Sequence, residues 1–98
     1  MTMWILKTAD EAEPLTFRLA AGTIKTAGRA TRADFIVDRH LVSRLHCRIT
    51  AGDEALTVED LESTNGTFVN GDRVTRADVK SGDTLRLGRV EFSIARES

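Results

Sequence analysis

The sequence of 98 residues has little of what would fix a fold covalently or anchor it in a membrane. Its single cysteine, Cys47, has no partner for an internal disulfide, and no histidine and cysteine cluster indicates a metal site. No apolar run approaches the ~20 residues of a membrane span. The apolar start, Trp4 to Leu6, lacks the basic segment and cleavage site of a signal peptide. We therefore expect no cofactor, no membrane and a reducing, cytoplasmic or otherwise intracellular setting (the nucleus in a eukaryote).

Aromatic residues and net charge are also scarce. Aromatics make up 5% of the chain, tyrosine is absent, and the formal net charge is −1, so neither a base-stacking platform nor the basic footprint of a nucleic-acid-binding protein is present. The charge is unevenly placed. Residues 29–48 contain five arginines and two aspartates, a local excess of +3, against −4 elsewhere. This distribution indicates a small anion site on an acidic body.

What is present is a strand-and-turn pattern in a chain that is 41% hydrophobic and 30% charged, which is ordinary for a folded domain. Apolar residues alternate with polar ones at 17–19, 56–58, 85–87 and 90–94, and glycine-containing turns separate these runs. The acidic stretch Asp10 to Glu13 before Pro14 predicts a loop. Many short strands predict an all-β sandwich or barrel. We expect one domain over residues 1–98 with a core at about 4–96, either a monomer or a module of a larger protein.

Two turns have a specific prediction. Asn70-Gly71 is the pair preferred by a type I′ hairpin turn, in which both central residues have positive φ. Gly88-Arg89, between Leu87 and Val90, fits the related turn with glycine first.

Three polar loop segments are candidates for chemistry. The first is Gly28-Arg29, in which glycine permits a tight turn and arginine offers a planar fork to a phosphate, although a glycine that ends a strand beside a solvated arginine is the commoner case. The second is Ser43-Arg44-Leu45-His46, in which Ser43 and Arg44 can donate to an anion while His46 braces the loop. The third, Ser63 to Thr67, is dense in hydroxyl and amide groups, and Asn65 can hydrogen-bond an incoming backbone.

These segments, in this order and spacing, resemble the forkhead-associated (FHA) family. Its motif is Gly-Arg, then Ser-Arg-x-His, then Asp-Leu-x-Ser-x-Asn-Gly-Thr-x-Val-Asn-Gly, and the third part matches Asp60 to Gly71 in full. Ser81 to Gly88 and Phe92 also look like the last strands of that family. The resemblance covers roughly residues 4–96.

The resemblance implies a two-sheet antiparallel β-sandwich with recognition loops at one end, which binds phosphothreonine on a partner protein. It implies five phosphopeptide-binding residues: Arg29, Ser43, Arg44, Thr64 and Asn65. It also implies four residues that shape the loops: Gly28, His46, Gly66 and Asn70. The function that follows is a phosphothreonine-dependent interaction module in Ser/Thr-kinase signalling, for which the arginine-rich composition favours a bacterial setting.

The same resemblance suggests a specificity loop at Arg39, His40 and Leu41, which would contact the third residue after the phosphothreonine. Two basic side chains against one leucine favour an acidic residue there. Glu62 departs from the family, which often has glycine at that position.

Two other functions compete with this one. The first is an FHA-type fold that acts as a phosphate-independent oligomerisation or scaffold surface. The second is an enzyme, a small hydrolase that uses Ser43 and His46, but the sequence lacks a nucleophile elbow and a third orienting residue. We expect no catalytic residues.

Overall fold

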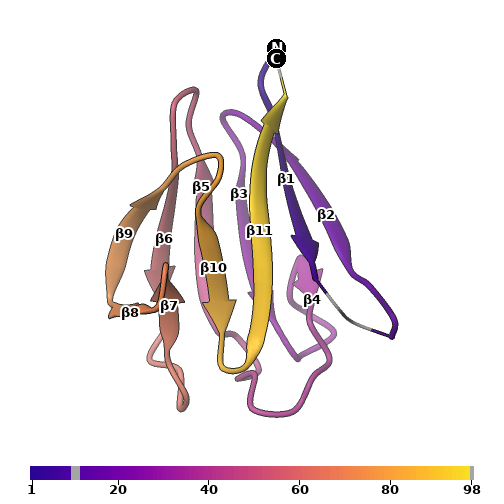
Figure 1. Ribbon diagram of the computed structural model, residues 1–98. Helices are drawn as coiled ribbons and strands as arrows, with labels where there is room; N and C mark the ends of the chain where they lie inside the picture. The colour runs from indigo at the N-terminus through magenta and orange to yellow at the C-terminus, as the bar shows by residue number, and fades with distance from the viewer. Residues whose placement is uncertain (10–11, 98) are drawn as a thin grey trace.

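The chain is described by a computed structural model over residues 1–9 and 12–97. The predicted loop at 10–13 lies partly outside these residues. Within them, the chain folds as two facing β-sheets without a helix, as Figure 1 shows. There is accordingly no helix in this part of the chain that is long and apolar enough to cross a membrane. The predicted all-β sandwich is confirmed.

The strands in chain order are β1 (Met3–Thr8), β2 (Thr16–Ala20), β3 (Ile24–Gly28), β4 (Phe35–Ile36), β5 (Cys47–Ala51), β6 (Leu56–Asp60), β7 (Thr67–Val69), β8 (Asp72–Val74), β9 (Arg76–Val79), β10 (Thr84–Leu87) and β11 (Val90–Glu97). The first sheet has the order β2-β1-β11-β10-β7-β8, and the second has the order β4-β3-β5-β6-β9.

The described pairings are antiparallel except for β3 with β4, which is parallel. The predicted two-sheet antiparallel sandwich is confirmed, with this short pair as its one parallel pairing among the described residues. The chain after β3 turns back on itself, because the Asp34 carboxylate accepts hydrogen bonds from the backbone N–H and hydroxyl of Thr26 at 2.8 and 3.2 Å. Phe35 therefore enters the sheet beside Ala27 and runs in the same direction as β3.

The core lies between the sheets and follows the two-residue period of the strands. Ile49 and Val58 are register partners in the second sheet and are fully buried, as are Leu85 and Phe92 in the first. Stacked rings of Phe17 and Phe35, with centroids 4.6 Å apart, join the two sheets at one side. Burial raises the pKa of the Cys47 thiol to about 12, so this cysteine behaves as a small apolar core residue.

Both predicted hairpin turns are confirmed by the backbone. Asn70 and Gly71 have φ of 50° and 88°, which is the type I′ pattern between β7 and β8. Gly88 has φ of 60° at the first turn position between β10 and β11. These turns fix strand register, because a tight turn permits only one pairing of the residues that flank it.

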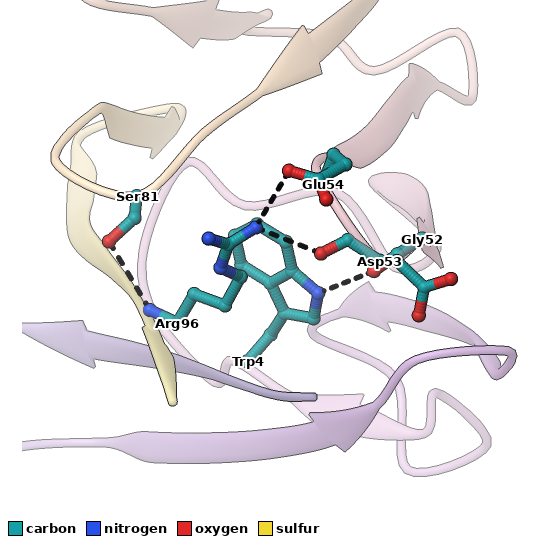
Figure 2. A network of polar contacts seen from close by, with 6 residues as sticks. All are labelled: Trp4, Gly52, Asp53, Glu54, Ser81 and Arg96. Atoms are coloured by element: carbon teal, nitrogen blue, oxygen red, sulfur yellow. Dashed lines mark hydrogen bonds and ion pairs between the residues drawn. The ribbon is translucent and has the colours of Figure 1, made fainter. Parts of the chain in front are cut away.

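A polar network joins the sheets at the end that holds the termini. The Trp4 indole donates to the Gly52 carbonyl at 2.8 Å, and Arg96 Nη1 donates to the Asp53 carbonyl at 3.0 Å and to Glu54 at 3.2 Å (Figure 2). These contacts connect β1 and β11 to the β5–β6 turn. The opposite end of the sandwich, where the β10–β11 turn lies in Figure 1, carries the long loops.

Candidate functional site

A cavity of about 320 Å³ opens among three loops: β3–β4, β4–β5 and β6–β7. Its lining consists of Arg29, His40, Leu41, Val42, Ser43, Thr64 and Asn65. Four of the five predicted phosphopeptide-binding residues therefore meet at one place, although they are up to 36 positions apart in the chain. Arg44 is exposed and is not part of the lining.

Arg29 is held in the cavity by backbone contacts between two loops. Its N–H donates to the Ser43 carbonyl, and its Nε donates to the Val42 carbonyl, both at 3.0 Å. A Cβ on Gly28 would overlap the Arg44 carbonyl, so only glycine lets the two loops come this close. The terminal nitrogens of the Arg29 guanidinium have no partner among the described residues and remain as donors for an anion.

His46 is fully buried and ties the β4–β5 loop to the β6–β7 loop. Its Nδ1 accepts the Ser43 N–H at 3.0 Å, so the proton is on Nε2, which donates to the Gly66 carbonyl at 2.8 Å. Burial lowers the pKa of His46, against the opposing effects of the Gly66 carbonyl and Asp60. The neutral imidazole is therefore the form that the fold selects.

Thr64 and Asn65 are joined to the loop that faces them. The Thr64 N–H donates to the Ser43 hydroxyl at 3.0 Å, and Asn65 Nδ2 donates to the Leu41 carbonyl at 3.1 Å. Asn65 Oδ1 accepts no hydrogen bond from the described residues, so it can receive one from an incoming peptide.

Asp60 forms the base of the β6–β7 loop. Its carboxylate accepts hydrogen bonds from the Ser63 N–H at 3.1 Å, the Ser63 hydroxyl at 2.5 Å and the Thr67 hydroxyl at 2.7 Å. Burial acts to raise the pKa of Asp60, but these hydrogen bonds outweigh it and lower the pKa. The charged carboxylate thus fixes the turn that presents Thr64 and Asn65.

Leu41 has a strained backbone that sequence reasoning missed. Its φ is 72°, which is rare for a bulky residue, and its carbonyl is held by Asn65 and packed against Gly88, where a Cβ would overlap it. Gly88 therefore lets the Leu41 carbonyl pack closely beside the site, in addition to forming the β10–β11 turn. Gly88 lies in the segment Ser81 to Gly88 that resembles the family, but its contact with Leu41 depends on the tertiary fold.

The three residues of the expected specificity loop line two different hollows. His40 and Leu41 line the cavity, whereas Arg39 lines a different hollow with Ala12, Glu13 and Asp38, and donates to the Glu13 carbonyl at 2.7 Å. The expected acidic preference rested on Arg39 together with His40, and only His40 is placed to support it.

The remaining predicted residues shape loops elsewhere. Asn70 Oδ1 accepts the Thr84 N–H at 3.0 Å and Asn70 Nδ2 donates to Asp83 at 3.2 Å, so Asn70 ties the β7–β8 turn to the start of β10. Glu62 is exposed with φ of 56°, a conformation that glycine adopts without strain.

The chemistry available to the cavity is anion binding. The donors of the cavity include the free end of the Arg29 guanidinium. Arg44, which follows the cavity residue Ser43 in sequence, makes no ion pair with a described residue. His46 accepts the backbone N–H of Ser43 and not its hydroxyl, so the two are not arranged as a general base and a nucleophile. Among the described residues there is no cluster of side chains that could hold a metal ion.

The fold and the site define a two-sheet β-sandwich whose end loops form a cavity that contains Arg29. The FHA domain family model matches residues 25–88. The chain therefore belongs to the FHA domain family.

Known proteins agree with this assignment. The chain is 35% identical over 81 residues to the ABC transporter ATP-binding/permease protein Rv1747 of Mycobacterium tuberculosis, covering 83% of the chain and 9% of that protein. The FhaA FHA domain, solved in complex with the intracellular domain of Rv3910, is 32% identical with a TM-score of 0.79, over 96% of this chain and 99% of that one. An FHA domain from a study of phosphothreonine-dependent FHA domain interactions is 30% identical with a TM-score of 0.85, over 100% of this chain and 99% of that one.

The chain spans between 9% and 47% of the length of eight curated relatives that it matches.

Proposed function

We propose that the chain is a phosphothreonine-dependent interaction module that binds phosphorylated partner segments inside the cell, in Ser/Thr-kinase signalling. The observation that carries this proposal is the cavity in which the unpaired end of Arg29 lies with Ser43, Thr64 and Asn65. A phosphate brings a charge of about −1.5 to −2 and three acceptor oxygens, which match these donors.

The placement of the cavity side chains supports the roles that the family resemblance implies. Arg29 and Ser43 would bind the phosphate, with Thr64 closing its cage. Arg44, which is exposed and adjoins the cavity residue Ser43, would join from the rim. Asn65 would hold the peptide backbone through its carbonyl oxygen. These contacts need little rearrangement, because hydrogen bonds among the loops already fix their backbones.

Preference for phosphothreonine over phosphoserine requires burial of one more methyl group. Leu41 and Val42 give the cavity lining an apolar part that could receive it. Burial of a methyl is worth about 0.8 kcal/mol, which corresponds to a roughly fourfold preference.

Fluorescence anisotropy with a degenerate phosphothreonine peptide library tests the proposal. Wild type should bind the phosphothreonine library, bind the phosphoserine version several-fold more weakly, and not bind the unphosphorylated one. Arg29→Ala should weaken binding by about tenfold or more, because charge-assisted hydrogen bonds to phosphate are lost. Arg18→Ala is the matched control, since Arg18 is an exposed arginine in β2 whose nearest acidic contact, Glu97, is 3.8 Å away.

Two results would contradict the proposal. Equal binding of phosphorylated and unphosphorylated libraries would favour the phosphate-independent surface considered above. An equal loss in Arg29→Ala and Arg18→Ala would show that general charge, and not this cavity, attracts the peptide.

A further inference from the structure

A row of side chains crosses the outer face of the first sheet beside the β6–β7 loop. Arg73 in β8 is the register partner of Phe68 in β7, and Phe68 is the partner of Arg86 in β10. The neighbours of Phe68 and Arg86 in sequence, such as Thr67 and Leu87, are buried, so this row points away from the core. We refer to Arg73, Phe68 and Arg86 as the arginine row.

Both arginines are held in place by contacts that leave their charge uncompensated. Arg86 lies over the Phe68 ring, with its Cζ 3.9 Å from the ring centroid, and its Nη1 donates to the Gly88 carbonyl at 2.7 Å. The Arg73 guanidinium and the edge of the Phe68 ring both lie close to Gly66: Arg73 Nε and Phe68 Cε1 are each 2.9 Å from the point where a Cβ on Gly66 would sit. Arg73 makes no hydrogen bond or ion pair with another described residue.

The carboxylates near the row do not neutralise it. Glu91 is the register partner of Arg86, but the two side chains form no ion pair, because no guanidinium nitrogen of Arg86 lies within 4.0 Å of a Glu91 carboxylate oxygen. Asp72 precedes Arg73 in β8, so its side chain points to the other face of the sheet. Two guanidinium groups with free N–H donors therefore face solvent against one carboxylate.

The row is close to the proposed phosphate site along the backbone. Asn65 lines the cavity, and the next residue, Gly66, is the one that Arg73 contacts, with neighbouring Cα atoms about 3.8 Å apart. The row spans two interstrand spacings, or about 10 Å. An extended segment advances about 3.3 Å per residue, so a side chain within about five residues of a bound phosphothreonine can reach it.

We propose that the arginine row is a second anion-binding platform, which takes a second anionic group carried by the same partner segment as the phosphothreonine. The group is either a carboxylate of Asp or Glu or a second phosphate, because both accept the paired donors of a guanidinium. This inference rests on the proposed function and extends the recognised ligand from one phosphate to a phosphothreonine with a nearby acidic group.

The test is a peptide series titrated by fluorescence anisotropy against wild type, Arg73→Gln and Arg18→Ala. The parent peptide has one phosphothreonine with neutral flanks, and the others carry a single Glu, or a second phosphothreonine, at each position up to five residues on either side. In wild type, one register of Glu should tighten binding about threefold, and a second phosphate in that register about tenfold. Arg73→Gln should abolish that gain and change the affinity for the parent peptide by less than about twofold.

Arg18→Ala should keep the whole gain, because Arg18 lies in β2 on the same sheet but three strands from Arg86. Arg73→Lys, which keeps the charge and loses the planar fork, should retain the gain with Glu in part. If every acidic peptide binds wild type like the parent, or if the gain persists in Arg73→Gln, the platform is disproved while the phosphothreonine site stands. If the parent itself fails to bind wild type, the proposed function and this extension of it both fall.

Discussion

His46 Nε2 lies 2.8 Å from the carbonyl oxygen of Gly66, and this buried contact helps to join two of the three loops that form the candidate site. The same imidazole accepts the Ser43 N–H through Nδ1. Both ring nitrogens are therefore occupied in a side chain with no solvent exposure.

Substitution of His46 should reduce both stability and peptide affinity. His46→Ala leaves the Ser43 N–H without its partner, leaves the Gly66 carbonyl with only the Gly88 N–H, and opens a cavity. We therefore expect a loss of about 2–4 kcal/mol in the free energy of unfolding. Urea unfolding followed by the fluorescence of Trp4, the only tryptophan, measures it. His40→Ala is the control, because His40 is exposed and should change stability by less than about 0.5 kcal/mol. An unchanged unfolding midpoint in His46→Ala would contradict this role.

Stability should fall as the pH drops from 7 towards 5. The pKa of His46 is lowered in the folded protein, chiefly by burial, so below pH 6.5 the unfolded chain binds a proton that the folded protein resists. The stabilising contribution of neutral His46 is thus fully present above pH 6.5 and is lost as the pH falls through the pKa of His46 in the folded protein. Urea midpoints at pH 5, 6, 7 and 8 should show this slope in wild type and a shallower one in His46→Gln. The same slope in both proteins would assign it to other groups.

Gly28→Ala should damage the site more than another glycine substitution does. A Cβ on Gly28 would overlap the Arg44 carbonyl, which forces apart the loops that hold Arg29 and Ser43. We expect a loss of about 2–3 kcal/mol in stability and weaker phosphothreonine binding. Gly22→Ala is the matched control: it meets no neighbouring atom, but its φ of 92° should cost about 1 kcal/mol without loss of binding. Equal peptide affinity in the two variants would show that Gly28 does not shape the site.

Glu62→Gly should be neutral or stabilising by up to about 1 kcal/mol. Glu62 has φ of 56°, and relief of that left-handed conformation offsets the greater flexibility that glycine gives the unfolded chain. Glu91→Gly, in the regular strand β11, should instead destabilise by about 0.5–1 kcal/mol. Thermal unfolding followed by circular dichroism compares them. A larger loss in Glu62→Gly than in Glu91→Gly would mean that the Glu62 side chain has a stabilising role.

Local sequence features determined much of this protein. The two-residue alternation at 56–58 and 85–87 predicted strands with one buried face, because successive side chains point to opposite sides of a strand. The pair Asn70-Gly71 predicted its own turn, since positive φ at both positions is a property of those residues. The motif residues predicted the family and the candidate site residues Arg29, Ser43, Arg44, Thr64 and Asn65, of which all but Arg44 line the cavity.

The tertiary structure alone decided which of these residues meet. Arg39 and His40 are adjacent in sequence, yet Arg39 lines a different hollow because the Glu13 carbonyl from another loop holds it. The parallel entry of β4, the strain at Leu41 and the convergence of Arg73 and Phe68 on Gly66 also depend on contacts between distant segments. Periodicity and turn chemistry act over a few residues, whereas these features come from packing between loops and strands that only the complete fold brings together.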